Sequence, residues 1–149
     1  MDLNTYKQSQ ERRYIVGCIY RSPNSSGENN SQLLQLLKAA NTNIYTNILI
    51  LGDFNFHPIN RESEQVNTAG GTETVTFIDA AKDNFLFQHI KVPTHCRSGY
   101  TPNILDLVFT RDEDTIEQLL TEAPLGLSDH SVVSLRICCD KEMWICISK

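Results

Sequence analysis

The sequence predicts an α/β fold in which one mixed sheet, or two packed sheets, is flanked by helices. Apolar runs of strand length, rich in β-branched and aromatic residues, outnumber the segments with helical periodicity. The connections between these segments range from hairpin length to crossover length, which favours sheets of mixed strand direction. With 149 residues, the chain has the size of one domain and can bury a substantial core.

The first elements follow a polar stretch, residues 1–13, that has no periodicity and is expected to be a disordered lead-in. Residues 14–20 form the first expected strand, and residues 21–30, rich in Ser, Asn, Gly and Pro, form the loop that ends it. Ser31 can then cap a helix. The apolar face of that helix follows helical spacing and comprises Leu33, Leu34, Leu36, Leu37 and Ala40.

A second expected strand, residues 48–51, ends in two polar residues. Its continuous apolar run, bounded by Asn47 and Gly52, is typical of a strand buried on both faces. Asp53 and Asn55 follow at its carboxyl end, where α/β folds gather their ligands. An Asx turn is the simpler alternative for these two residues.

The remaining elements alternate in the same way. A long surface loop is expected over residues 57–71, and the next helix is capped by Thr72 or Thr74 and ends near Asn84. Its expected apolar stripe comprises Val75, Phe77, Ile78 and Ala81. Further strands are expected at residues 85–92, 104–110 and 115–120, with a last strand at 131–138. Residues 93–103 form a loop that carries His95 and Arg97, residues 124–127 form a turn, and residues 139–149 form an unassigned tail.

Composition limits the classes of function. The net charge of −5 argues against binding nucleic acid through a basic face, but it does not exclude an enzyme that meets phosphate through a bound divalent cation. The five cysteines have neither an even count nor a CxxC spacing, so neither a disulfide framework nor a zinc site is expected from them. Reduced and mostly buried thiols in an intracellular protein are the favoured interpretation. The sequence shows neither a signal peptide nor a membrane-spanning segment.

Asp106 is unusual because it lies inside an apolar strand. A buried carboxylate costs several kcal/mol unless it is paired, on the order of the penalty for unpaired buried charge. His130 is a natural partner, and Asp106 would fix the tautomer of its imidazole, as in a hydrolase triad. The alternatives are a carboxylate satisfied by backbone donors and a purely structural polar loop at residues 128–130.

The other polar residues suit phosphodiester hydrolysis. Asp53 and Asp129 could bind a divalent cation or activate water. Asn55 could hold a phosphate oxygen or the attacking water, and Tyr20 could donate to a developing phosphorane oxygen. Because the sequence has neither a nucleophile elbow nor a Gly-rich phosphate loop, water is the favoured nucleophile.

Four short motifs occur in a characteristic order along the chain. They are CIYRSPN at 18–24, LGDFN at 51–55, LDLVF at 105–109 and LSDH at 127–130. The chain resembles the endonuclease/exonuclease/phosphatase superfamily over most of residues 14–137. It looks closest to the apurinic-type endonuclease domains of non-LTR retrotransposons, which precede a reverse transcriptase. The resemblance implies a four-layered α/β sandwich of two packed mixed sheets flanked by helices, with a site for Mg²⁺ or Mn²⁺ at one edge.

The resemblance also implies a role for each motif residue. Tyr20 corresponds to a phosphate-contacting tyrosine, Asp53 to the aspartate that activates water, and Asn55 to the asparagine beside it. Asp106 corresponds to the aspartate that orients the catalytic histidine, Asp129 to a metal-site aspartate, and His130 to the histidine at the scissile phosphate. The family often has a Thr-Arg pair before the Asp106 strand, where this chain has Thr94 and His95.

The front of the domain departs from the family pattern, because family members place a metal-binding glutamate before the segment equivalent to Tyr14. Glu11 has neither the preceding strand nor the spacing to replace it. Residues 14–138 are therefore expected to be the carboxyl-terminal portion of such a domain, incomplete at its amino terminus, with exposed strand edges and apolar faces that the other portion would cover.

Two functions follow as expectations. The first is metal-dependent hydrolysis of phosphodiester bonds by a DNA endonuclease of retroelement origin, with a reverse transcriptase domain in the parent polyprotein, no membrane partner, and an intracellular location that includes the nucleus. The second is a catalytically impaired relic, or a domesticated binding module, that keeps the fold. The sequence leaves open whether the substrate is abasic DNA, target-site DNA, RNA or a phosphoinositide, since loops set substrate choice.

Overall fold

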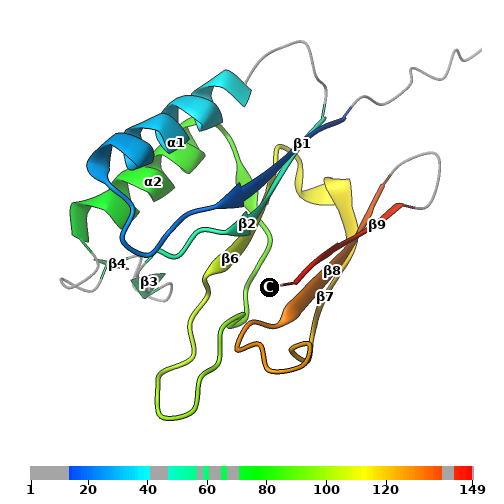
Figure 1. Cartoon of the computed structure of the whole chain (residues 1–149). Coiled ribbons are helices and arrows are strands. Elements are labelled where there is room, and N and C mark those ends of the chain that lie inside the picture. Colours follow the sequence, from blue (N-terminus) through cyan, green and yellow to red (C-terminus); the bar gives the residue numbers. More distant parts are fainter. Residues whose placement is uncertain are drawn as a thin grey trace, which may run out of the picture.

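The computed structural model describes residues 14–40, 47–56, 59–60, 65–66, 71–138 and 143–148. The lead-in at residues 1–13 and parts of the expected loop at 57–71 lie outside these ranges. The elements, labelled in Figure 1, are β1 (Tyr14–Tyr20), α1 (Gly27–Ala40), β2 (Asn47–Asp53), β3 (Ile59–Asn60), β4 (Gln65–Val66), α2 (Gly71–Asp83), β5 (Phe87–Gln88), β6 (Asp106–Thr110), a 3-10 turn at Glu113–Thr115, β7 (Ile116–Glu122), β8 (Val132–Ile137) and β9 (Met143–Ile147).

A mixed four-stranded sheet has the strand order β1-β2-β6-β5. β1 runs parallel to β2, whereas β6 is antiparallel to both of its neighbours, β2 and β5. The register places Tyr20 opposite Asp53, and Asp53 opposite Asp106. The carboxyl end of β2 therefore meets the beginning of β6, which brings two of the predicted site residues together.

A second, antiparallel sheet has the order β7-β8-β9 and packs against the first sheet on the side away from the helices (Figure 1). The strand expected last, at residues 131–138, corresponds to β8 and is followed by β9 in the tail. β3 and β4 pair with each other inside the segment expected to be a loop. Together with the helices, the two packed sheets confirm the predicted α/β class.

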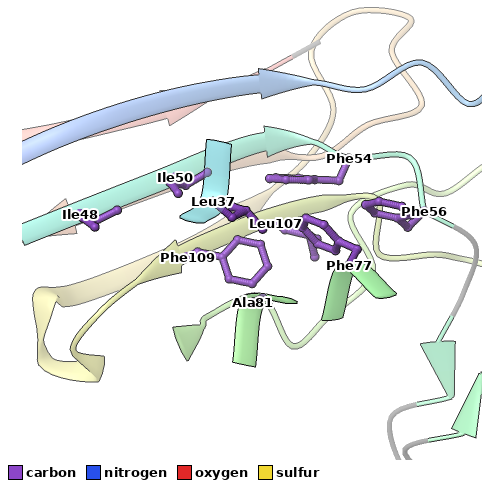
Figure 2. Packing of buried hydrophobic residues seen from close by; sticks show 9 residues of the cluster. All are labelled: Leu37, Ile48, Ile50, Phe54, Phe56, Phe77, Ala81, Leu107 and Phe109. Carbon is purple, nitrogen blue, oxygen red and sulfur yellow. The ribbon is translucent and has the colours of Figure 1, made fainter. Parts of the chain in front are cut away.

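The helices cover one face of the first sheet (Figure 1). Ile48 and Ile50 of β2 point toward them and share a cluster with Phe54 and with Phe77 of α2. Figure 2 shows the cluster, in which the rings of Phe54 and Phe77 lie 5.3 Å apart and those of Phe56 and Phe77 stack at 4.5 Å. Its other labelled members are Leu37, Ala81, Leu107 and Phe109.

The opposite face of the first sheet packs on the second sheet. Leu49 and Leu51 of β2, which alternate with Ile48 and Ile50, are buried here. The cluster is completed by Ile90, by Val108 of β6 and by a row of β8 residues, Val133, Leu135 and Ile137. β2 is thus covered on both faces, as its continuous apolar run predicts.

Both helices begin earlier than expected. Ser26, rather than Ser31, accepts the Asn29 N–H at the start of α1, while the Ser31 hydroxyl donates to the Gly27 carbonyl inside the helix. α2 begins at Gly71, so Thr72 and Thr74 lie within it and do not cap it.

The buried face of α2 also differs from the expected apolar face, because Thr74 is buried whereas Val75 is 39% exposed. The helix ends at Asp83, immediately before the expected Asn84, and the chain leaves it through Phe85 at a positive φ of 54°.

Three expected strands have different bounds in the structure. The strand expected at residues 85–92 is reduced to β5, and the one expected at 115–120 is β7. The strand expected at 104–110 begins at Asp106, so this carboxylate belongs to the first residue of β6 and does not lie in the middle of the strand.

No helix of the described part is long and apolar enough to span a membrane.

The cysteines differ from expectation in their exposure. All four that the structure describes are free thiols, but Cys18, Cys96 and Cys146 are exposed and Cys138 is only partly buried. Cys18 and Cys146 lie on edge strands, β1 and β9, and Cys96 lies in a loop, where neighbouring elements do not cover them.

Candidate functional site

Two buried carboxylates meet where β2 ends and β6 begins. Asp53 is 6% exposed and Asp106 4% exposed, and they are directly opposite each other in the antiparallel pair. Because side chains alternate along a strand, Asp53 continues the Leu49 and Leu51 row, and Asp106 continues the Val108 row. Both carboxylates therefore lie on the face that meets the second sheet.

His130, just before β8, reaches the same point from the second sheet. Its Nδ1 lies 2.9 Å from Asp106 Oδ2, and the residue is buried. An ionised carboxylate only accepts hydrogen bonds, so Nδ1 carries the proton and Nε2 remains as the nitrogen that can accept one. The expected pairing of Asp106 with His130 is confirmed.

Thr94 fixes the position of Asp106. Its fully buried hydroxyl oxygen accepts the N–H groups of Leu105, at 3.2 Å, and Asp106, at 3.0 Å. The Thr94 side chain therefore anchors the beginning of the strand that carries the carboxylate.

Asn55 and Arg21 brace the end of β2. The Asn55 N–H donates to Asp53 Oδ1 at 3.2 Å, which is the Asx turn considered from the sequence, and Asn55 has a φ of 46°. Its side-chain Nδ2 donates to the Arg21 carbonyl, and Arg21 Nη1 donates to the Asn55 carbonyl, both at 2.9 Å. Burial lowers the pKa of the Arg21 guanidinium, and the negative charge of Glu73 partly offsets this decrease. Asn55 thus has a structural role, and its contact with phosphate stays a prediction.

Tyr20 lies opposite Asp53 in the parallel register but is 65% exposed. It is on the same face of β1 as Val16 and Cys18, both of which are also exposed. The structure brings Tyr20 to the strand end where Asp53 and Asp106 meet, and its contact with phosphate stays a prediction.

His95 is a member of the site that the sequence placed only in a loop. Its Nε2 lies 3.1 Å from Asp129 Oδ2, and its ring centroid lies 5.0 Å from that of His130 in an edge-to-face arrangement. The hydrogen bond from His95 is the main cause that lowers the pKa of Asp129. In the sequence, the only indication of a role for His95 is that it stands where the family often has the arginine of a Thr-Arg pair.

The described residues contain two groups that could hold a metal ion, one formed by Asp53, Asp106 and His130 and the other by His95, Asp129 and His130. In each group the ligand atoms lie within 4.8 Å of one another. Asp53 and Asp129, the two expected metal ligands, fall in different groups that share His130. Carboxylate oxygens suit Mg²⁺, which takes one or two of them together with waters and substrate phosphates.

This group of carboxylates and histidine has the donor types of a candidate site for a divalent metal ion. The profile of the endonuclease-reverse transcriptase family matches residues 14–134, so the chain belongs to that family.

A solved structure described as the endonuclease domain of TRAS1, a telomere-specific non-LTR retrotransposon, is similar to this chain with a TM-score of 0.56. The two are 17% identical, and the match covers 82% of this chain and 54% of that one, so this chain spans about half the length of that domain. The similarity confirms the predicted fold. Among curated proteins, no sequence matches the chain.

Proposed function

We propose that this chain contributes the active centre of an endonuclease that hydrolyses phosphodiester bonds in DNA with the help of a divalent cation. The observation that carries the proposal is the buried group of Asp53, Asp106 and His130, in which the Asp106 carboxylate holds the imidazole at 2.9 Å. Membership of the endonuclease-reverse transcriptase family supports nuclease chemistry at this group.

Asp53 and His130 would share the chemistry between them. Asp53, held in place by the Asn55 N–H, would orient and deprotonate the attacking water. His130, its Nδ1 bound to Asp106, would present Nε2 to the scissile phosphate and stabilise the charge that develops on it. Tyr20 and Asn55 would add neutral donors to phosphate oxygens.

A magnesium ion fits the donor types, because each of the two groups offers a hard carboxylate oxygen, from Asp53 in one and from Asp129 in the other, and Mg²⁺ takes few protein carboxylates. When bound, the ion would supply Lewis acidity at a phosphoryl oxygen. Mn²⁺ suits the same oxygen ligands. The protein's own residues would bind and orient the phosphate and move the proton of the water.

The substrate and setting follow from the family. Its description joins an endonuclease to a reverse transcriptase, which supports DNA as the substrate and a reverse transcriptase domain as a partner in the same polyprotein. An enzyme acting on genomic DNA would work in the nucleus.

Nicking of supercoiled DNA by the full chain tests this function. We expect nicking that requires Mg²⁺ and that Asp53→Asn and His130→Gln each abolish. Asp79→Asn, which removes an exposed carboxylate on α2, is the matched control and should keep full activity. Nicking that survives both site substitutions would refute the assignment of the active centre.

A catalytically impaired relic, or a binding module, is the second candidate. It is favoured by the use of the Asn55 amide to hold the Arg21 carbonyl. A folded chain that binds DNA but gives no magnesium-dependent nicking would support this candidate over the endonuclease.

A further inference from the structure

The group formed by His95, Asp129 and His130 contains two imidazoles and one carboxylate, so nitrogen atoms predominate among its ligand atoms, whereas magnesium prefers oxygen. The proposed hydrolysis assigns no task to His95. Nevertheless, the side chain is only 18% exposed, and its one hydrogen bond in the described part of the chain joins Nε2 to Asp129. Its Nδ1 is buried without a hydrogen-bond partner among the described residues. A buried polar side chain with an unpaired atom calls for an explanation, and the proposed hydrolysis does not supply one.

The backbone fixes the two imidazoles next to each other. His95 and His130 are directly opposite in an antiparallel bridge. The flanking hydrogen bonds run from the Cys96 N–H to the Asp129 carbonyl, at 2.9 Å, and from the Ser131 N–H to the Thr94 carbonyl, at 2.7 Å. This pattern makes the histidines a non-hydrogen-bonded pair, the arrangement that brings opposite side chains closest together.

The spacing of the ligand atoms suits a tetrahedral ion. With bonds of about 2.0–2.1 Å, two ligands of tetrahedral zinc lie roughly 3.3 Å apart. His95 Nε2 and Asp129 Oδ2 are 3.1 Å apart, so an ion could replace the proton between them with little movement of either side chain. The third ligand atom, from His130, lies within 4.8 Å of both.

Asp106 completes the arrangement from outside the group. A histidine that binds a metal usually donates its other ring N–H to a carboxylate, which orients the ring and makes the ligating nitrogen more basic. The 2.9 Å contact between His130 Nδ1 and Asp106 Oδ2 provides this support before any ion binds.

We propose that His95, Asp129 and His130 form a site for Zn²⁺ with a fourth position open to water or an anion. Imidazole nitrogens select zinc over magnesium, which prefers oxygen ligands and octahedral geometry. Three protein ligands with one open position are the usual composition of non-structural zinc sites.

Zinc at this site would withdraw His130 from phosphate. This consequence rests on the proposed function, because it assumes that His130 acts in hydrolysis, and it makes zinc an inhibitor of magnesium-dependent nicking. Zinc binding itself does not depend on the chain being a nuclease, so a direct binding experiment separates the two proposals.

The test follows histidine-ring nitrogen NMR signals of the full chain, labelled with ¹⁵N, during titration with ZnCl₂ at about pH 7.5, where neutral imidazoles are available as ligands. We expect the His95 and His130 signals to change together and to saturate at one equivalent, while the His89 signals do not move. MgCl₂ at the same concentration should not give His95 or His130 the ring-nitrogen shifts of a metal-bound imidazole, because Mg²⁺ prefers oxygen ligands. Unchanged His95 and His130 signals at one equivalent of zinc would overturn the proposal without use of any variant.

Calorimetric titration with ZnCl₂ adds the matched variants. His95→Gln removes one zinc ligand and should therefore weaken zinc binding at least tenfold, as changes around metal sites typically do. His89→Gln, at a histidine outside both groups, and Cys96→Ser, at the exposed thiol next to His95, should bind as the unchanged chain does. Binding that is lost in Cys96→Ser and kept in His95→Gln would assign the zinc to thiols and contradict the site.

Discussion

At the scale of single residues, Thr94 links the loop before β6 to the site. Its hydroxyl oxygen accepts two amide hydrogens, from Leu105 and Asp106, in a fully buried position. Its carbonyl also accepts the Ser131 N–H, next to His130. One residue therefore holds both the strand that carries Asp106 and the segment that carries His130.

Thr94→Val should destabilise the fold by about 1–3 kcal/mol, because an apolar side chain of similar shape leaves buried amides without an acceptor. Thr94→Ser keeps the oxygen and is the control, with an expected loss below about 1.5 kcal/mol from the missing methyl group. Urea unfolding measures both. Equal stabilities for the two variants would show that the hydroxyl does not anchor β6.

His89 gives the fold a pH dependence. Burial, followed by the nearby charge of Lys91, lowers its pKa from 6.5 to about 4. The unfolded chain therefore binds more protons than the folded chain between these values, so the stability that His89 contributes is present above pH 6.5 and is lost as the pH falls toward 4.

Between pH 7 and pH 5, this contribution should fall by about 1 kcal/mol once partial exposure is allowed for. His89→Gln cannot titrate and should therefore flatten the decline in the free energy of unfolding over that range. Urea unfolding at the two pH values checks this. An equally steep decline in the variant would place the pH dependence on other groups.

The sequence predicted some site residues and missed others for a physical reason. The pairing of Asp106 with His130 could be predicted because a carboxylate in an apolar strand needs a partner. His95 could not be placed, because its proximity to His130 depends on a backbone bridge between two loops that sequence periodicity does not record. Asp53 was placed at a strand end correctly, but its separation from Asp129 into another group depends on tertiary packing.

At the scale of elements, β2 organises the structure because both of its faces are buried and both of its edges are paired. Gly52 lies opposite Ile19 on one side and Leu107 on the other. Its φ is +141°, and a Cβ atom there would lie only 1.9 Å from the Ile19 carbonyl oxygen. The close approach of β1 to β2, just before Asp53, requires a glycine.

Gly52→Ala should cost at least about 3 kcal/mol or prevent folding, since the obstructing atom belongs to the backbone and the φ is strained for alanine. Gly17→Ala, in the neighbouring strand, is the matched control. A Cβ there would meet Ile50 Cγ1 at an ordinary 3.8 Å, so its stability should change by less than about 1 kcal/mol. Similar thermal unfolding of the two variants would contradict the steric argument.

Element positions were more predictable than their ends. The apolar runs located β1, β2, β6 and β8, because burial on a sheet dictates their composition. The start of α1 was wrong because Ser26 and Ser31 are both acceptable caps, and only the loop geometry before Gly27 decides between them. β9 could not be assigned because Trp144 and its neighbours lie on an edge strand with half-exposed side chains.

At the scale of the whole molecule, the α/β class was predictable because it depends on the balance of strands, helices and connection lengths. Which strands share a sheet was not, since β1-β2-β6-β5 and β7-β8-β9 are joined by non-local pairing. The net charge of −5 also belongs to this scale. It gives the proposed endonuclease no general attraction for DNA, so binding should depend on the divalent cation and a few local contacts.

DNA affinity should therefore depend weakly on salt. With Mg²⁺ present, the slope of log K against log salt concentration should lie between 0 and about −3, corresponding to three or fewer neutralised phosphates. Fluorescence anisotropy with a labelled duplex measures this slope. A slope of about −6 or steeper would reveal an extensive cationic surface and contradict binding through the metal centre.

The central claim is that the carboxylate of Asp106 orients the imidazole of His130 at a reacting phosphate. The most direct test compares the single-turnover rate of magnesium-dependent DNA nicking in the unchanged chain and in Asp106→Asn, with folding of both verified by circular dichroism. The asparagine amide can stabilise the wrong tautomer of His130, so the rate should fall by about 10²–10⁴. A folded Asp106→Asn chain that nicks DNA within about twofold of the original rate would contradict the claim.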